Sequence, residues 1–213
     1  MDADAVEVRV LGCLIEKQRT TPDVYPLSLN SLRLACNQAT NRDPVVDYDE
    51  ATIREALQRL WRKEWARLAS GQGSRTVKYR HLLGETLALE PPQLSVLAVL
   101  MLRGAQTPGE LKQRTERLHP FGTLADVEST LDTLIERELV VRLDRRAGQK
   151  EERYAQLLGG ASADAAADGP ALGTPQRIAA VAPGLEERIA SLEAQVTVLR
   201  EALEALAGPL EDV

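Results

Sequence analysis

The chain contains two copies of one sequence pattern, and this internal repeat constrains its fold more than any other feature. The segment VLGCLIEKQRTTP at 10–22 aligns with VLAVLMLRGAQTP at 96–108, an offset of 86 residues. The segment TIREALQRLWRKEW at 52–65 aligns with DVESTLDTLIEREL at 126–139, an offset of 74 residues. The second copy is therefore shorter by 12 residues between these segments (86 − 74 = 12). Such self-similarity predicts two units of one fold.

The first copy, residues 1–84, reads as three helices followed by a hairpin. Apolar residues spaced by three and four predict a helix over 5–18. Ser28 and Asp49 are the predicted N-caps of the next two helices, because their side-chain oxygens can accept from unpaired backbone N–H groups. The VYPL segment predicts a short strand, and two β-compatible runs around SGQGS predict the hairpin. The expected inner faces are Leu29, Leu32, Leu34 and Cys36 on the second helix, and Ile53, Leu57, Leu60 and Trp61 on the third.

The second copy, residues 85–158, repeats this order. Its helices are expected at about 92–103, 108–116 and 124–138, before a hairpin that turns at Arg146, Ala147 and Gly148. Helix, short strand, helix, helix, strand, turn and strand is the order of a winged helix, a variant of the helix-turn-helix. We therefore predict a mainly α fold with small β hairpins, built from two tandem winged-helix domains and a C-terminal coiled-coil helix.

Two further segments, 159–184 and 185–207, differ from both copies. Ala, Gly and Pro fill 17 of the 26 positions of the first segment, which predicts a flexible linker. The second has apolar residues at alternating steps of four and three, a heptad pattern that predicts a parallel two-stranded coiled coil and hence a homodimer. The same apolar stripe could instead pack on the chain's own domains. The predicted dimerisation residues are Leu185, Ile189, Leu192, Val196, Leu199, Leu203 and Leu206.

The net charge of −6 is unevenly distributed. Residues 1–84 carry a net charge of +2, residues 85–160 carry −2 and residues 161–213 carry −6. The acidity therefore comes mostly from the tail and does not argue against a polyanionic partner for the first copy. The start of the chain lacks a basic region followed by an apolar run, and the longest apolar run, LSVLAVLML, is too short to span a bilayer. With two cysteines and no disulfide framework, the chain is expected to be cytoplasmic, without a membrane partner.

Several long motifs resemble those of the YceH-like family of bacterial proteins. They are TTPDVYPLSLNSLRLACNQATNRDPV, SGQGSRTVKY, LRGAQTPGELKQRTERLHPF and ADVESTLDTL. The resemblance covers nearly all of residues 5–158, and members of the family tend to carry a C-terminal helical, heptad-like tail. It implies a tandem winged-helix fold and leaves the activity open.

No pattern of residues typical of catalysis or metal binding stands out. Cys13 and Cys36 lie on apolar helix faces and are expected to be small core residues. The two histidines, His81 and His119, fall in different copies, so neither is expected to act as a base for a cysteine nucleophile. Two Cys and two His at these spacings do not match a zinc site. We therefore expect no enzyme activity, no cofactor and no metal.

The polar face of the first copy's third helix is the predicted DNA-binding surface. In a winged helix this helix usually enters the major groove, and the hairpin contacts the backbone. Arg, Gln and Asn side chains can read the edges of guanine and adenine. A mixed-charge surface exposed only to solvent is the alternative, since Glu55 and Glu64 lie on the same helix. The predicted DNA-contact residues are Asn41, Arg42, Thr52, Arg54, Gln58, Arg59, Arg62, Arg75 and Lys78.

The second copy is a poorer candidate for DNA. Its third helix displays Glu128, Asp132 and Glu136, which would repel phosphate. It is expected to pack against other parts of the protein or to bind a partner protein. A rival hypothesis follows: the chain is a dimeric scaffold whose winged-helix domains grip a partner protein, and its acidic second copy and heptads suit that role.

The stretch ACNQATNRDPVVDYDE at 35–50 contains most of the residues that the second copy lacks. Pro44 prevents continuation of the second helix, and Asp49 begins the third. Because the repeat does without this insertion, we expect it to determine what the first copy binds. Asn41 and Arg42 are the residues predicted to lie at the mouth of the third helix.

Overall fold

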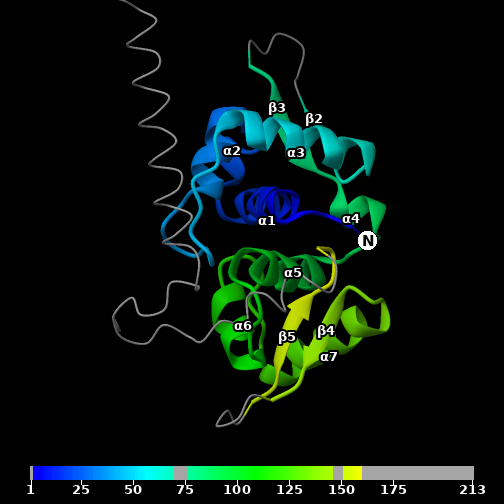
Figure 1. Ribbon diagram of the computed structural model, residues 1–213. Coiled ribbons are helices and arrows are strands. Elements are labelled where there is room, and N and C mark those ends of the chain that lie inside the picture. Colours follow the sequence, from blue (N-terminus) through cyan, green and yellow to red (C-terminus); the bar gives the residue numbers. More distant parts are fainter. Residues whose placement is uncertain (1, 70–75, 146–150, 160–213) are drawn as a thin grey trace, which may run out of the picture. The chain divides into compact units, whose positions relative to one another are not determined.

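Seven α-helices and two small antiparallel sheets make up the part of the chain that the structure describes (Figure 1). That part comprises residues 2–69, 76–145 and 151–159 of a computed structural model. It falls within one compact unit, Met1–Gly169. None of its helices is long and apolar enough to cross a membrane. The predicted coiled coil at 185–207, and the predicted linker from residue 160 onward, lie outside the described residues.

The first half has the predicted order of elements. Asp4, Ser28 and Asp49 each accept a hydrogen bond from a backbone N–H three residues further on, and so begin its three long helices. The predicted N-caps at Ser28 and Asp49 are confirmed. The elements are α1 (Ala5–Thr20), η1 (Pro22–Val24), β1 (Leu27–Ser28), α2 (Leu29–Cys36), α3 (Glu50–Arg62), β2 (Ala66–Leu68) and β3 (Lys78–His81).

The three strands of the first half form one antiparallel sheet in the order β1-β3-β2. Tyr79 of the central strand pairs with Leu27 on one side and with Leu68 on the other. The short predicted strand therefore joins the predicted hairpin in one sheet. The tip of this hairpin, residues 70–75, lies outside the described residues.

The second half repeats the pattern with a reduced sheet. A bridge between Gln106 and Tyr154 stands where the first half has β1. The predicted turn at Arg146, Ala147 and Gly148 lies outside the described residues. The elements are α4 (Leu83–Thr86), which leads into this half, then α5 (Pro91–Arg103), α6 (Pro108–Thr115), α7 (Leu124–Glu136), β4 (Val140–Leu143) and β5 (Arg153–Gln156).

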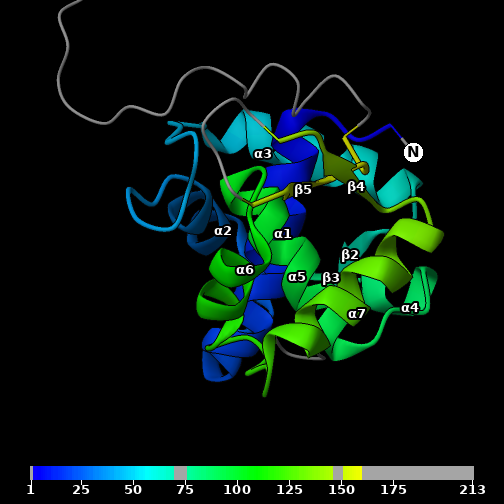
Figure 2. The same cartoon turned by 90° about the horizontal axis from the view of Figure 1, so that it is seen from below.

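The first helices of the two halves, α1 and α5, pack against each other (Figures 1 and 2). All residues from Glu7 to Ile15 of α1 and from Leu94 to Leu102 of α5 are buried. Gly12 permits the close approach, because a Cβ added there would lie 2.9 Å from Cδ2 of Leu102 and 3.1 Å from Cβ of Met101. The buried apolar side chains of both halves consequently form one continuous core.

Two predicted inner residues are wrong. Trp61 is 65% exposed and Leu34 is 55% exposed. In α3 the core positions are Ile53, Ala56, Leu57 and Leu60, and the buried tryptophan is Trp65, just after the helix. The apolar stripe of α3 is thus narrower than its periodicity indicates, and Trp61 lies beside it, facing solvent.

The contact at Gly12 yields a stability prediction. Gly12→Ala should lower the free energy of unfolding by about 1–3 kcal/mol, because the added methyl group overlaps Leu102 in a packed core. Urea unfolding followed by circular dichroism measures the change.

Gly109→Ala in α6 is the matched control. The nearest atom to a Cβ at that position is Oγ1 of Thr107, 4.0 Å away, so the change should be neutral or stabilising by up to about 1 kcal/mol. Equal losses of stability in the two variants would contradict close packing of α1 on α5.

Candidate functional site

The outer face of α3 carries part of the predicted DNA-binding set. Arg54, Gln58 and Arg62 are exposed, and Thr52 is half-buried at the start of the helix. Lys78 is half-buried at the start of β3, and Arg75 lies outside the described residues. The structure therefore brings three predicted side chains together along one exposed helix face.

Arg59 has a different environment from its neighbours on α3. Its guanidinium lies 2.7 Å from Oδ2 of Asp4 and 3.8 Å from Oε2 of Glu7. Lys63 also contacts Glu7, at 2.8 Å. These two cations attach the end of α3 to the start of α1, so Arg59, which was predicted to bind DNA, is held in an ion pair within the protein.

A groove of about 380 Å³ lies between α3 and the sheet. Trp61 and Leu57 of the helix and Leu68 and Tyr79 of the sheet give it an apolar lining. Trp61 and Leu68 are 65% and 59% exposed. The polar and charged residues of the lining are Arg54, Gln58 and Arg67. Large exposed apolar groups cluster at interaction sites. This face therefore has two features that could bind a partner, an apolar groove and a basic rim.

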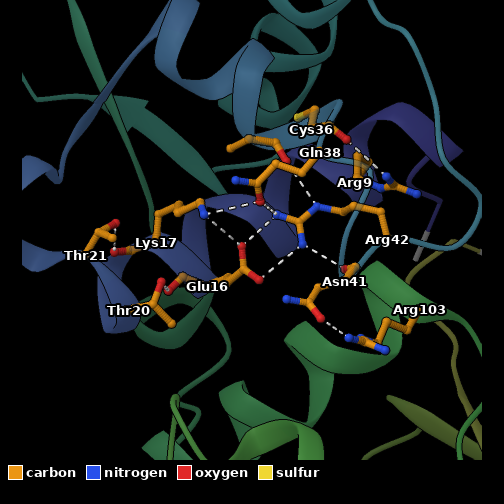
Figure 3. A network of polar contacts seen from close by, with 11 residues as sticks. Arg9, Glu16, Lys17, Thr20, Thr21, Cys36, Gln38, Asn41, Arg42 and Arg103 are labelled. Atoms are coloured by element: carbon orange, nitrogen blue, oxygen red, sulfur yellow. Dashed lines mark hydrogen bonds and ion pairs between the residues drawn. The ribbon is translucent and has the colours of Figure 1, made fainter.

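Arg42, predicted to lie at the mouth of α3, is instead buried in a polar network (Figure 3). Its guanidinium binds both carboxylate oxygens of Glu16, at 3.1 and 2.6 Å. It also donates to Oε1 of Gln38 and to the backbone carbonyls of Ala35 and Asn41. Its side chain has no exposed surface, so the prediction that Arg42 contacts DNA is corrected. Burial of a guanidinium requires such partners, and they lie inside the protein.

Two further side chains hold the insertion in place. Arg9 of α1 is buried and donates to the carbonyl oxygens of Cys36 and Pro44, at 3.1 and 2.6 Å. Asn37 bonds both the N–H and the carbonyl of Tyr48. The insertion is therefore fixed to α1 and α2 by polar contacts at several points along its length.

Asn41 faces the second half of the molecule. Its backbone is in the left-handed region, with φ of 60°, and its Oδ1 accepts from the guanidinium of Arg103 on α5 (Figure 3). The next contact is a hydrogen bond of 2.8 Å from the N–H of Asp43 to the carbonyl of Leu102. Asn41 is thus placed at the junction of the halves and not at the mouth of the third helix, and its contact with DNA stays a prediction.

The two cysteines and His81 have surroundings typical of structural residues. Cys13 and Cys36 are both fully buried and hydrogen bond to each other, which confirms the prediction that they are core residues. This hydrogen bond and, next, burial raise the pKa of the Cys36 thiol. Burial lowers the pKa of His81 to about 4, with Nε2 of the ring 2.7 Å from Oε1 of Gln18. Among the described residues, no three His, Cys, Asp or Glu side chains form a group that could hold a metal ion.

The equivalent face of the second half has the opposite charge. At an offset of 74 residues, Arg54 and Arg62 correspond to the exposed acids Glu128 and Glu136. Its wing contains cations already paired with acids: Arg142 lies 3.5 Å from Glu152, and Arg145 lies 3.7 Å from it. The predicted difference between the halves is therefore present in the surface charge that the structure describes.

Comparison with known proteins identifies relatives along nearly the whole chain. Residues 3–149 match the family model described as "Protein of unknown function, DUF480". A UPF0502 protein of Pelobacter propionicus is 51% identical over 97% of this chain and 94% of its own. A UPF0502 protein of Geotalea daltonii is 55% identical over 78% of this chain and 76% of its own, and one from Pectobacterium atrosepticum is 43% identical over 95% and 97%. The resemblance to YceH-like bacterial proteins is consistent with these matches.

The buried network yields a prediction about Arg42. Arg42→Met should lower the free energy of unfolding by about 3 kcal/mol, because it leaves the carboxylate of Glu16, itself 12% exposed, without its main partner. Urea unfolding measures the loss.

Arg54→Met is the control, since Arg54 is exposed; it should change stability by less than about 0.5 kcal/mol. In a double-mutant cycle with Glu16→Gln, the coupling energy between Arg42 and Glu16 should exceed about 1 kcal/mol. Additive losses would contradict a stabilising pair.

Proposed function

Since the chain belongs to the DUF480 family, which carries no assigned activity, we propose its function from its own geometry. We propose that it is a non-catalytic, DNA-associated protein of the transcription-regulator kind. On this proposal each half is a winged-helix unit, and the first half contacts duplex DNA with α3 and the β2–β3 wing. The site of action is the cytoplasm.

The order of elements supports the winged-helix assignment. Each half has a first helix, a short strand or bridge, two further helices and an antiparallel hairpin. In such units the third helix and the wing form the contact surface with DNA. In this chain those elements are α3 with β2 and β3, and α7 with β4 and β5.

One observation carries the proposal: four basic side chains of the first contact surface have no acid paired with them, although Arg59 and Arg80 do. Arg54, Arg62, Arg67 and Lys78 form no ion pair within the part of the chain that the structure describes, whereas Arg142 and Arg145 of the second wing both pair with Glu152. Unpaired cations on one face favour a polyanion, because each phosphate that they neutralise releases counterions. Gln58, exposed between Arg54 and Arg62, could read an adenine edge.

Gel retardation of duplex DNA tests this proposal. The full chain should retard DNA at about 50 mM salt, and affinity should fall steeply by 200 mM. Replacing both arginines, Arg54→Ala with Arg62→Ala, should weaken binding and reduce the slope of log K against log salt by about 2, one for each lost phosphate contact.

Arg142→Ala with Arg145→Ala is the matched control in the second half, and it should leave retardation nearly unchanged, since both side chains are already paired with acids. If the full chain retards no duplex even at low salt, DNA is not the partner.

The apolar groove favours a second candidate, a dimeric scaffold that binds a partner protein through the same face. DNA binding gives no reason for Trp61 and Leu68 to be exposed, whereas protein interfaces are enriched in Trp, Tyr and Arg. Trp61→Ser with Leu68→Ser separates the candidates. The DNA proposal expects salt-dependent retardation to persist in this variant. The scaffold proposal expects that a protein co-purifying with the native chain is lost from it.

Both candidates include a dimer formed by residues 185–207, outside the described residues. Light scattering should give two subunits for the full chain and one for a chain that ends at residue 158, because only the heptad segment is expected to pair. Equal subunit numbers for the two chains would refute pairing through this segment. Leu192→Asp with Leu199→Asp in the full chain should also give one subunit.

A further inference from the structure

A cleft of about 400 Å³ lies where the C-terminal ends of α1 and α5 meet the insertion and α6. Three arginines line it: Arg103 at the end of α5, and Arg114 and Arg117 at the end of α6 and just beyond it. Asn41 of the insertion and Gln113 of α6 add polar groups. Both halves and the insertion therefore contribute to one basic cavity, separate from α3 and its wing.

The acids near the cleft leave its positive charge in excess. Glu16 lines the cleft, but both of its carboxylate oxygens are bound by Arg42, at 3.1 and 2.6 Å. Glu110 lies 3.1 Å from Arg114 and offsets that one charge. Arg117 is exposed and forms no hydrogen bond or ion pair with any residue that the structure describes. Arg103 is bound by the neutral amide of Asn41.

The surroundings of Arg103 reflect this excess. Partial burial, followed by the nearby cations Arg114 and Arg42, lowers the pKa of its guanidinium. A cation held among other cations gains more from an incoming anion than an isolated one. The geometry places donors from three arginines and two amides around one hollow, with Val99, Leu102 and Leu118 as an apolar wall.

We propose that this cleft binds a small organic oxyanion, a molecule with a phosphate or carboxylate head and a partly apolar body. Guanidinium groups match the planar pairs of oxygens on phosphates and carboxylates. The volume lies within the range of about 300–1,000 Å³ that is typical of small-molecule sites. Arg117 and Arg114 bind the oxyanion, Arg103 and Asn41 orient it, and the apolar wall packs against the body of the ligand.

The position of the cleft means that binding of an anion there should affect the stability of the protein. A bound anion connects the insertion of the first half with α5 and α6 of the second, so it stabilises the arrangement of the two halves. Any ligand that binds only the folded state raises stability in proportion to the logarithm of its concentration over its Kd. The insertion of the first copy thus supplies Asn41 to this ligand site.

Isothermal titration calorimetry of the full chain tests the proposal, with sodium pyrophosphate and citrate as separate probes. At least one should bind saturably with a Kd in the millimolar range or below, and the tighter of the two shows whether the ligand head is a phosphate or a carboxylate. Arg117→Ala should weaken binding by about tenfold or more, the effect of losing one charge-assisted hydrogen bond. Asn41→Asp, which places a carboxylate beside Arg103, should weaken it comparably while retaining the fold.

Arg54→Ala with Arg62→Ala is the control, because both residues lie outside the cleft; it should change anion affinity by less than about twofold, even where it removes DNA retardation. The proposal is overturned if neither probe binds saturably, or if the control weakens binding as much as Arg117→Ala does. Failure of DNA binding would leave it intact, since the two tests use different residues.

Discussion

The packing of α1 against α5 determines how the two copies are combined. Nine consecutive residues of each helix are buried, so each helix is covered on all sides over that stretch. Its own half covers one side, and the equivalent helix of the other half covers the opposite side. Gly12 brings the two backbones close enough for Leu102 and Met101 to fill the space. The repeats therefore share one core, and the cleft at the ends of α1 and α5 exists only because they do.

Local chemistry made much of the fold predictable. Ser28 and Asp49 begin helices because a capping oxygen and a following apolar period leave few other choices. The two alignments of the repeat located both hairpins. The choice between Trp61 and Trp65 was not predictable in this way, because both lie near the apolar stripe of α3. Glu64, with φ of 58°, ends the helix between them, and this backbone turn directs Trp65 into the core and leaves Trp61 in solvent.

The candidate site could be predicted from the sequence only where it consists of exposed side chains on a single helix. Arg54, Gln58 and Arg62 follow from helical periodicity. Arg42 does not, since it lies in the loop between α2 and α3 and its main partner, Glu16, is 26 positions away on α1. A signal was nevertheless present: Glu7 and Arg9 interrupt the apolar VEVRVLG segment of a helix that had to be buried, and buried charges require partners. Arg9 finds them in the carbonyl oxygens of Cys36 and Pro44, at the start and in the middle of the insertion.

The third helices of the two halves share their buried positions and differ in their exposed charges. At an offset of 74 residues, the buried positions keep their character: Ile53, Leu57 and Leu60 correspond to Val127, Leu131 and Leu134. The exposed positions do not, because Arg54, Gln58 and Arg62 correspond to Glu128, Asp132 and Glu136. Core packing requires neither set of charges, since all six of these side chains face solvent. The reversed charge therefore affects only which charged molecules each surface attracts. A polyanion would be attracted by α3 and repelled by α7. Equivalent faces of the two halves therefore keep the same core positions and differ in the sign of their exposed charge.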